Sequence, residues 1–257
     1  MLDDLKFILI RWRLIHLLGA LNIKGRYARS ILGQLWLTLS VLLLILSTGL
    51  VWSLIWKQPI QFFLPYVGIG QVIYLFVAAT INESAGVIVA DQRLYVSEHM
   101  PCTVSIATHI YKNLLMLAHN VPIIIGLIIW SHAIKLTVNI YYVPSFIATV
   151  IFLFFMSYII ATICTRFRDL IQLVASIMQA SFLITPVMWN LTVIPQKYHF
   201  YVLLNPFASC LEILRNPLIG LPIEPVAYKI LLAWTVISGL TALIVHKTME
   251  KNTIFWI

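Results

Sequence analysis

Long stretches without a charged residue constrain this sequence more than any other feature. No Asp, Glu, Lys or Arg occurs between Ser30 and Trp56, and similar apolar windows recur along the chain. About 20 consecutive apolar residues are enough for a helix to cross a bilayer. Overall, 61% of the residues are hydrophobic and 10% are charged, whereas soluble domains average about 45–50% and about 25%. The sequence therefore predicts an all-α integral membrane protein and excludes both a soluble domain and a disordered chain.

The apolar windows predict six transmembrane helices separated by short polar segments. Their expected bounds are residues 34–56, 62–90, 104–130, 142–164, 170–189 and 226–246. Residues 1–30 combine apolar residues at helical spacing with six Lys and Arg, a pattern typical of an amphipathic helix on the membrane surface. We therefore expect one transmembrane domain over residues 1–257, made of an interfacial helix at 1–30, a six-span bundle at 34–246 and a tail at 247–257.

The distribution of basic residues predicts the orientation of these helices. With the N-terminus in the cytoplasm, twelve of the 17 Lys and Arg fall on cytoplasmic segments, in agreement with the positive-inside rule. Six spans then return the C-terminus to the cytoplasm as well. The net charge of +8 is explained by topology and requires no nucleic-acid partner.

The segment between the fifth and sixth predicted spans, residues 192–225, differs from an ordinary loop. It is too apolar for a solvated loop, and five prolines divide it into pieces too short to cross a bilayer. Irregular backbone persists at membrane depth only against protein or a watery cavity. We expect a re-entrant segment on the periplasmic side, with a folded surface cap as the alternative. Its candidate residues are Asn205, Pro206, Glu212 and Arg215, of which the last two are spaced to pair on one helical face.

Glu83 is the most informative single residue, because it interrupts the second apolar window. An acidic residue in the middle of a transmembrane helix costs roughly 2.5–3.5 kcal/mol on insertion scales. It therefore needs a partner, and two roles are open: a gate or pathway residue, or a packing hydrogen bond, for instance to Asn120. Aromatic residues near the helix ends suit either an interfacial belt or a passage for sugars. The pathway and gate candidates are Glu83, Tyr66, Tyr74, Trp189 and Asn120, with Trp189 following Pro186 in a span expected to be kinked.

Motifs that carry out chemistry are missing from the sequence. It contains no GxxxxGK[ST] phosphate loop, no GxSxG, no HExxH and no CxxC, and its three cysteines are far apart. We therefore expect no catalytic residue, no metal site and no cofactor in this chain.

Several segments, taken together in their order and spacing, resemble the type-2 ABC exporter permeases of polysaccharide export. The resemblance is closest to the exporters of O-antigen and other lipid-linked polysaccharides, and it covers nearly the whole chain. The segments that carry it are RYARSILGQLWLTLS (26–40), FLPYVGIG (63–70), INESAG (81–86), AHN (118–120), TRFRD (165–169), TPVMW (185–189) and NPFASCLEILRNPLIG (205–220).

This resemblance implies a permease domain in the bacterial inner membrane that works as a homodimer. Two separate cytoplasmic ABC ATPase subunits would hold ATP and Mg, and the substrate would be a polyprenyl-linked polysaccharide moved from cytoplasm to periplasm. The resemblance also implies a coupling segment that contacts the ATPase, with Asp91, Arg93, Tyr95, Glu98 and His99 as its residues. Arg26 and Arg29 are the candidates for contact with the lipid pyrophosphate.

Other functions remain open at this point. Within the same family, the substrate could be a capsular polysaccharide or a teichoic acid. In a different class, an ion-coupled secondary transporter would use Glu83 as a proton carrier, although no inverted repeat is seen. A lipid-modifying enzyme would instead be centred on His119 and Asn120.

Overall fold

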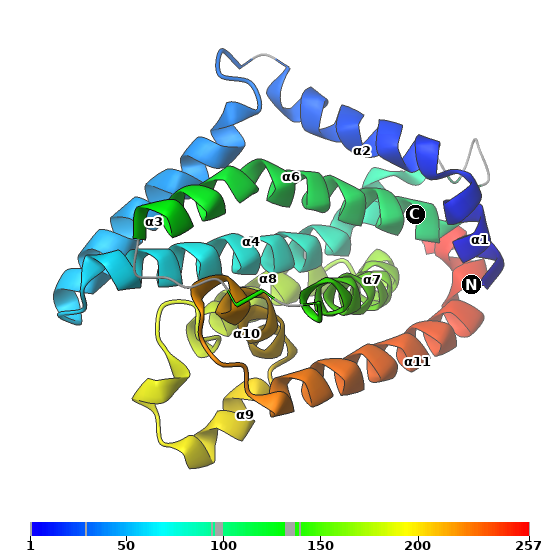
Figure 1. The fold of residues 1–257 in the computed structure, drawn as a ribbon. Coiled ribbons are helices and arrows are strands. Elements are labelled where there is room, and N and C mark those ends of the chain that lie inside the picture. Colours follow the sequence, from blue (N-terminus) through cyan, green and yellow to red (C-terminus); the bar gives the residue numbers. More distant parts are fainter. Residues whose placement is uncertain are drawn as a thin grey trace.

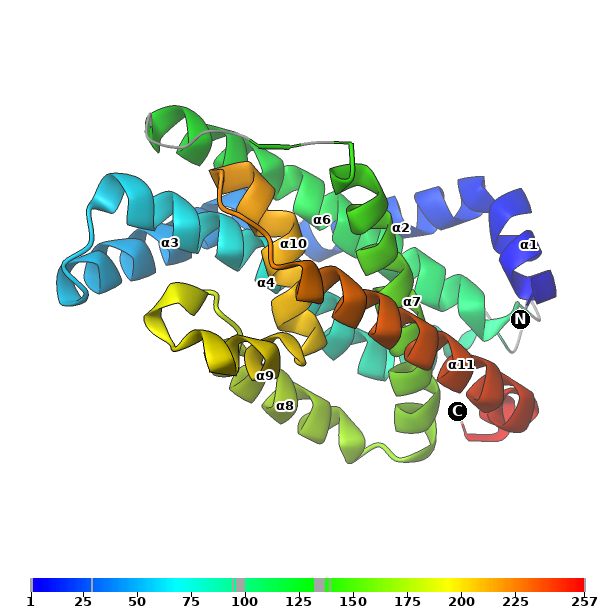
Figure 2. The same cartoon turned by 60° about the horizontal axis from the view of Figure 1, so that its bottom comes forward.

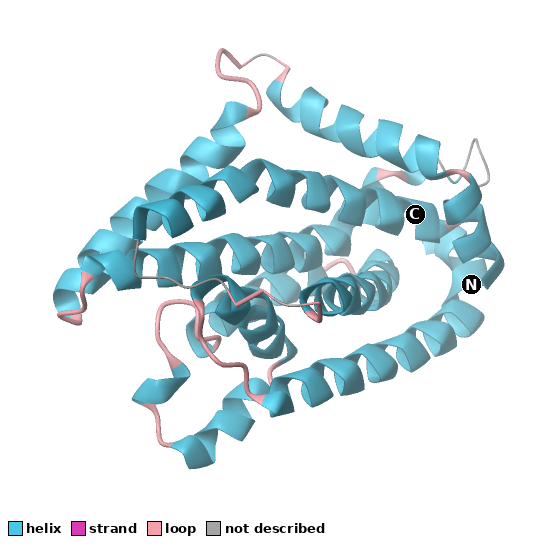
Figure 3. Cartoon of the chain, viewed as in Figure 1, coloured by secondary structure: helices cyan, strands magenta, loops and turns pink. Residues whose placement is uncertain are grey.

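The computed structural model describes residues 2–28, 30–93, 95, 100–131, 137–138 and 140–256, and its regular elements within these ranges are all helices (Figure 3). The N-terminal region forms α1 (Leu2–Ile10) and α2 (Trp12–Tyr27). The long helices are α3 (Leu35–Ile55), α4 (Ile60–Ala90), α6 (Cys102–Ser131), α7 (Tyr142–Arg166) and α11 (Pro225–Trp256). The shorter elements are α8 (Leu170–Ile184), η1 (Leu191–Val193), η2 (Gln196–Tyr198), α9 (His199–Leu203) and α10 (Pro206–Ile219).

Five helices among the described residues, α3, α4, α6, α7 and α11, are long and apolar enough to cross a membrane. Four of them, α3, α4, α6 and α7, begin and end within two residues of a predicted span. Helix α11 begins one residue before its predicted span but continues to Trp256, through most of the predicted tail. These helices confirm the prediction of an all-helical, multi-pass membrane protein.

The fifth predicted span is shorter than expected. Residues 170–189 were predicted to form one kinked helix, but α8 has 15 residues and ends at Ile184. Its cap residue Thr185 is extended, with ψ 134°. Proline disfavours helical backbone at the residue before it, so Pro186 ends α8 instead of kinking it. A helix of 15 residues is only about 22 Å long, which is less than the roughly 30 Å hydrocarbon core.

Helix α4 lies at the centre of the bundle, in contact with α3, α6, α7, α8 and α10 (Figure 1). Small residues on α4 permit close approach of its neighbours, as is common where apolar helices associate in lipid. A methyl group on Gly68 would lie 2.9 Å from Ile45 of α3 and 2.6 Å from Leu127 of α6. On Gly70 it would lie 3.3 Å from the guanidinium of Arg215 in α10. The two glycines therefore bring three helices onto α4.

Both chain termini lie at one end of the bundle, and the α3–α4 turn lies at the other (Figures 1 and 2). We call these the terminal end and the turn end. At the terminal end, α2 packs along α6, and α1 also contacts α6. The single amphipathic helix predicted for residues 1–30 is divided at Arg11, which has a non-helical ψ of 26°.

The segment predicted to be re-entrant folds into short helices, of which α10 is the longest. Asn205 caps α10 by accepting a hydrogen bond from the Phe207 backbone at 3.0 Å, and Pro206 follows at the first helical position. Gly220 ends the helix in the left-handed conformation, with φ 71°. Between its two caps, Asn205 and Gly220, α10 packs against α4, α7 and α11 (Figure 2). This segment therefore contributes to the core of the bundle.

Candidate functional site

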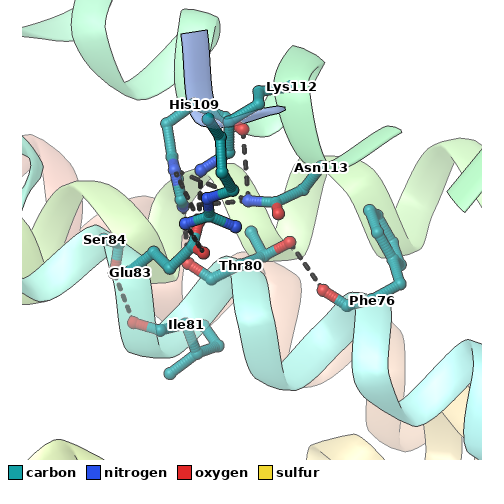
Figure 4. A network of polar contacts seen from close by, with 9 residues as sticks. Phe76, Thr80, Ile81, Glu83, Ser84, His109, Lys112 and Asn113 are labelled. Atoms are coloured by element: carbon teal, nitrogen blue, oxygen red, sulfur yellow. Dashed lines mark hydrogen bonds and ion pairs between the residues drawn. The ribbon is translucent and has the colours of Figure 1, made fainter. Parts of the chain in front are cut away.

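A cluster of charged side chains surrounds Glu83, seven residues before the end of α4 (Figure 4). Lys112 of α6 forms an ion pair with Oε2 of Glu83. The guanidinium of Arg26, on α2, lies 3.4 Å from Oε1. His109, one turn before Lys112, places Nδ1 3.8 Å from Oε2. One carboxylate therefore joins α2 to both α4 and α6.

The spacing of residues on α6 explains how the cluster is assembled. His109, Lys112 and Asn113 are three and four residues apart, so they share one face of the helix. His109 Nε2 donates a hydrogen bond to the Thr80 carbonyl oxygen of α4 at 2.9 Å, and Asn113 Nδ2 donates to the His109 carbonyl oxygen at 3.2 Å. The bond to Thr80 holds the imidazole against α4, next to Glu83 (Figure 4).

The partners of Glu83 explain how this acid is tolerated in an apolar helix. A buried charge is strongly unfavourable unless an opposite charge or hydrogen bond compensates for it. Here two cations, Lys112 and Arg26, contact the carboxylate and compensate for its charge. The proposed packing bond to Asn120 was wrong. Asn120 lies eight residues after Lys112 on α6. It is buried, and its Oδ1 has no hydrogen-bond partner.

A cavity of about 490 Å³ lies beside this cluster. Its walls come from α2, α3, α4, α6 and α8, and its polar lining includes Asn22, Arg26, Glu83, Asp91, Thr108 and Lys112. The Thr108 side chain is 3% exposed and its hydroxyl has no hydrogen-bond partner. The structure thus brings together residues from two separate predictions, Glu83 as a gate residue and Arg26 as a pyrophosphate contact.

The predicted coupling segment follows α4 at the terminal end. Asp91 caps α4 through its backbone and lines the cavity, and burial raises the pKa of its carboxyl. Arg93 is exposed, whereas the Tyr95 side chain is buried against Ile88 and Cys102. Glu98 and His99, like the predicted pyrophosphate contact Arg29, lie outside the described residues.

A second cluster lies at Arg215, which is 2% exposed in α10. Its guanidinium lies over the ring of Tyr66 in α4, 3.9 Å from the ring centroid. Nη1 donates a hydrogen bond to the Pro186 carbonyl oxygen at 2.6 Å, just after α8 ends. The Tyr66 hydroxyl donates to the Trp189 carbonyl oxygen at 2.9 Å. Together these contacts hold the chain that follows α8 against α4 and α10.

Glu212 and Arg215 do not form the ion pair that their spacing predicted. Glu212 Oε1 instead accepts a hydrogen bond from the Glu224 backbone at 2.7 Å, and Oε2 is buried without a partner. The Glu224 carboxylate binds His199 at the start of α9, and this bond raises the pKa of the His199 imidazole. The two charged residues diverge because Arg215 is held by α4 and the α8 end, while Glu212 is held by the linker before α11.

The remaining aromatic candidates, Tyr74 and Trp189, both bind backbone carbonyl oxygens of α8. The Tyr74 hydroxyl donates to the Met178 carbonyl oxygen at 2.7 Å, and its ring contacts Phe182. Trp189 donates through Nε1 to the Leu183 carbonyl oxygen at 3.2 Å. Both residues thus stabilise α8 and the chain after it, and their use in a passage stays a prediction.

Sequence reasoning missed the partners Lys112 and His109. Lys112 is one of the twelve basic residues assigned to cytoplasmic segments, although it lies eight residues inside the predicted span 104–130. A basic residue at that depth signals a buried acidic partner. Glu83 was the acid available on the neighbouring predicted helix, so this signal was present in the sequence.

Comparison with known proteins matches this chain to one family model and to relatives that share one name. The family model described as "ABC-2 type transporter" matches residues 13–219, which include both clusters and most of the bundle. The chain is also similar to the O-antigen export system permease protein RfbA of Klebsiella pneumoniae, at 24% identity over 189 residues and 73% of each chain. A protein of the same name from Myxococcus xanthus is 24% identical over 196 residues, again covering 73% of each chain.

Proposed function

The chain belongs to the ABC-2 type transporters, and we propose that it is the transmembrane subunit of an ABC exporter for O-antigen polysaccharide. The observation that carries this proposal is the family match over residues 13–219 together with relatives named as O-antigen export permeases. The lack of a phosphate loop in the sequence is in keeping with a subunit that relies on a separate ATPase.

In this proposal two copies of the chain form the channel, and each works with one cytoplasmic ABC ATPase subunit in the bacterial inner membrane. The terminal end faces the cytoplasm, where most Lys and Arg of the sequence were expected. The exposed apolar faces of α3 and α8 suit contact with lipid or with the second copy.

The six-span topology also belongs to this proposal, with the short helix α8 as the fifth span. The chain between α8 and α11 would then dip into the outer leaflet and return. Arg215 and its bonds to the chain after α8 support this arrangement, because they satisfy polar groups that lipid would leave unpaired.

Transport would begin when ATP binding closes the ATPase subunits and moves the coupling segment that starts at Asp91. Since Asp91 lines the cavity beside Glu83, movement of this segment would reach the Arg26–Glu83 contact directly. The lipid-linked chain would enter at the terminal end, with its pyrophosphate near Arg26. A long polymer would then advance through the bundle, held weakly enough at each step to be released.

Deletion of the gene for this chain tests the proposal. We expect the deletion strain to lose long-chain polysaccharide from its surface and to accumulate lipid-linked polysaccharide inside, and we expect the wild-type gene to restore export. Polysaccharide that still reached the surface of the deletion strain at the normal level would overturn the proposal. Loss of surface polysaccharide without internal accumulation would also contradict it, because that result points to synthesis.

A further inference from the structure

A groove of about 660 Å³ lies between the N-terminal helices and α7, within the range of roughly 300–1,000 Å³ typical of ligand pockets. Residues of α6 line it between residues of α1 and α2 on one side and residues of α7 on the other. Helix α2 lies along α6 (Figure 1), and a methyl group on Gly19 would lie 2.8 Å from the Tyr111 ring. This close approach leaves little space between α2 and α6, so the groove separates the N-terminal helices from α7.

The lining of this groove is almost entirely hydrocarbon. Side chains such as Leu9, Phe154 and Phe155 cover it, and none of the described residues that line it is Asp, Glu, Lys or Arg. Apart from the Trp12 indole, its polar side chains are those of His16 and Tyr111, which are hydrogen-bonded to one another. Lipid tails are as apolar as leucine, so a groove of this kind at membrane depth is suited to hydrocarbon.

The depth of the groove matches one leaflet of a bilayer. On α6 the lining extends from Ala107 to Leu114, about 8–18 Å from the first residue of the helix at 1.5 Å per residue. Half of a hydrocarbon core about 30 Å thick is about 15 Å. The groove therefore ends near the centre of the bilayer, which suits the acyl chain of a phospholipid in one leaflet better than a chain that spans both leaflets.

Exposed basic residues lie beside the groove. Arg11 and Arg13 are the neighbours of Trp12 in the chain, and Trp12 lines the groove while remaining 60% exposed. The Arg11 guanidinium lies over the Phe7 ring, 5.5 Å from its centroid. Neither arginine forms an ion pair among the described residues, so both can receive an anionic group.

The acidic residues of this region do not balance these arginines. Residues 1–29 contain six Lys and Arg and two Asp, which is a net charge of +4. The Asp4 carboxylate faces His246 of α11, at 3.9 Å from Nδ1. Of the six basic residues, Arg26 is paired with Glu83. The charge beside the groove therefore stays positive.

We propose that the groove binds an acyl chain of an anionic phospholipid, with the lipid phosphate at Arg11 and Arg13 and the chain along α6. The arginines then compensate the phosphate, and the hydrocarbon covers the apolar lining. The bound lipid fills the space between the N-terminal helices and α7 and so fixes α1 and α2 on the bundle. This site does not depend on the proposed transport function; only its place in the cytoplasmic leaflet follows from the orientation in that proposal.

Tryptophan quenching in the full-length chain tests the site, because bromine on an acyl chain quenches a tryptophan that the chain touches. The chain is placed in phosphatidylcholine nanodiscs with increasing fractions of a lipid brominated on its acyl chain. The chain has eight Trp, so the Trp12 signal is the difference between the wild type and Trp12→Phe. We expect brominated phosphatidylglycerol to half-quench Trp12 at a mole fraction at least fivefold lower than brominated phosphatidylcholine. Equal quenching by the two lipids would overturn the proposal. So would unquenched Trp12, which would show that a second copy or another protein segment covers the groove.

Two substitutions that remove the same charge test the headgroup contact. Arg11→Gln is expected to weaken phosphatidylglycerol binding about fivefold, the contribution of one basic residue near an anionic surface. Lys24→Gln also removes one exposed cation from the N-terminal helices, but neither Lys24 nor its neighbours in the chain line the groove. We expect this control to change binding less than twofold. Equal effects of the two substitutions would indicate attraction by net charge alone and would overturn the proposed phosphate contact.

Two further substitutions test whether the acyl chain enters the groove. Ala107→Phe fills it from α6 and Val150→Phe fills it from α7, while both keep Arg11 and Arg13. We expect each to raise the mole fraction for half-quenching of Trp12 at least fivefold. Thermal unfolding shows which variants are folded, and either folded variant is sufficient for the test. Unchanged quenching in a folded variant would place the lipid on the outer surface of α1 and α2 and would overturn the proposal.

Discussion

The guanidinium of Arg215 lies 3.9 Å from the centroid of the Tyr66 ring, in the middle of the helical bundle. This contact joins α10, from the last third of the chain, to the central helix α4. The same guanidinium binds the Pro186 carbonyl oxygen, and the Tyr66 hydroxyl binds that of Trp189. A pair of side chains thus fixes the backbone at which α8 ends.

Arg215→Met should destabilise the protein, because it removes a buried cation–π contact and leaves the Pro186 carbonyl oxygen unpaired. A desolvated cation–π contact is worth about 2 kcal/mol and an unpaired buried acceptor costs about 1–3 kcal/mol. Tyr66→Phe keeps the ring but loses one hydrogen bond, so its loss should be smaller, about 1 kcal/mol. Thermal unfolding in detergent, followed by tryptophan fluorescence, measures both. Equal stability of Arg215→Met and the wild type would contradict this account.

Glu212→Gln should leave stability unchanged or raise it. The amide oxygen can still accept the Glu224 N–H hydrogen bond, and the substitution removes a buried charge of which one oxygen has no partner. Glu212→Ala should lower stability by about 1–3 kcal/mol, since it leaves the Glu224 N–H unpaired. The same unfolding measurement compares the two variants. A Gln variant as unstable as the Ala variant would show that the charge itself is needed.

The His199–Glu224 contact should make stability depend on pH. The bond to Glu224 raises the pKa of His199 above its unfolded value of about 6.5. The stabilisation is therefore complete below the unfolded pKa and is lost as the pH rises through the folded pKa. The melting temperatures of the wild type and His199→Gln should differ most near pH 6 and converge toward pH 9. His119→Gln, which removes a histidine that binds its own helix, serves as the control. A difference that grew with pH would reverse the assigned sign.

Gly68→Ala should destabilise the bundle, whereas Gly126→Ala should not. A methyl group on Gly68 would lie 2.6 Å from Leu127 and 2.9 Å from Ile45, so α3 or α6 must shift. Overpacking of this kind costs about 1–3 kcal/mol. Gly126 has open space around its added methyl group, and alanine in a helix is favoured over glycine by up to about 1 kcal/mol. Unfolding measurements on the two variants should therefore change in opposite directions.

Local features of the sequence were sufficient to predict most helices. The predicted spans at 34–56 and 62–90 correspond to α3 and α4 within two residues, because a long apolar run has few structures open to it in a membrane. The prediction for residues 170–189 failed at one point, where Pro186 ends α8. A proline within a transmembrane helix can either kink that helix or end it, and the sequence alone does not distinguish these two outcomes.

Charge partners were harder to predict than helices. Glu83 and Arg26 were each singled out, but for separate roles, and Lys112 was not connected with either. Glu212 and Arg215 had the spacing of an ion pair, yet each found a different partner outside α10. Spacing along one helix shows which residues share a face, but it does not show which other elements that face contacts.

The sequence by itself determined that this protein is a multi-pass helical membrane protein, because apolar length and charge placement act locally along the chain. Only the tertiary structure decided that Arg26, Glu83, His109 and Lys112 form one cluster and that Arg215 lies on Tyr66. These contacts join residues far apart in sequence, and they depend on how each helix is rotated and placed against its neighbours. That rotation is set by the packing of the whole bundle, including the close approaches at Gly68 and Gly70.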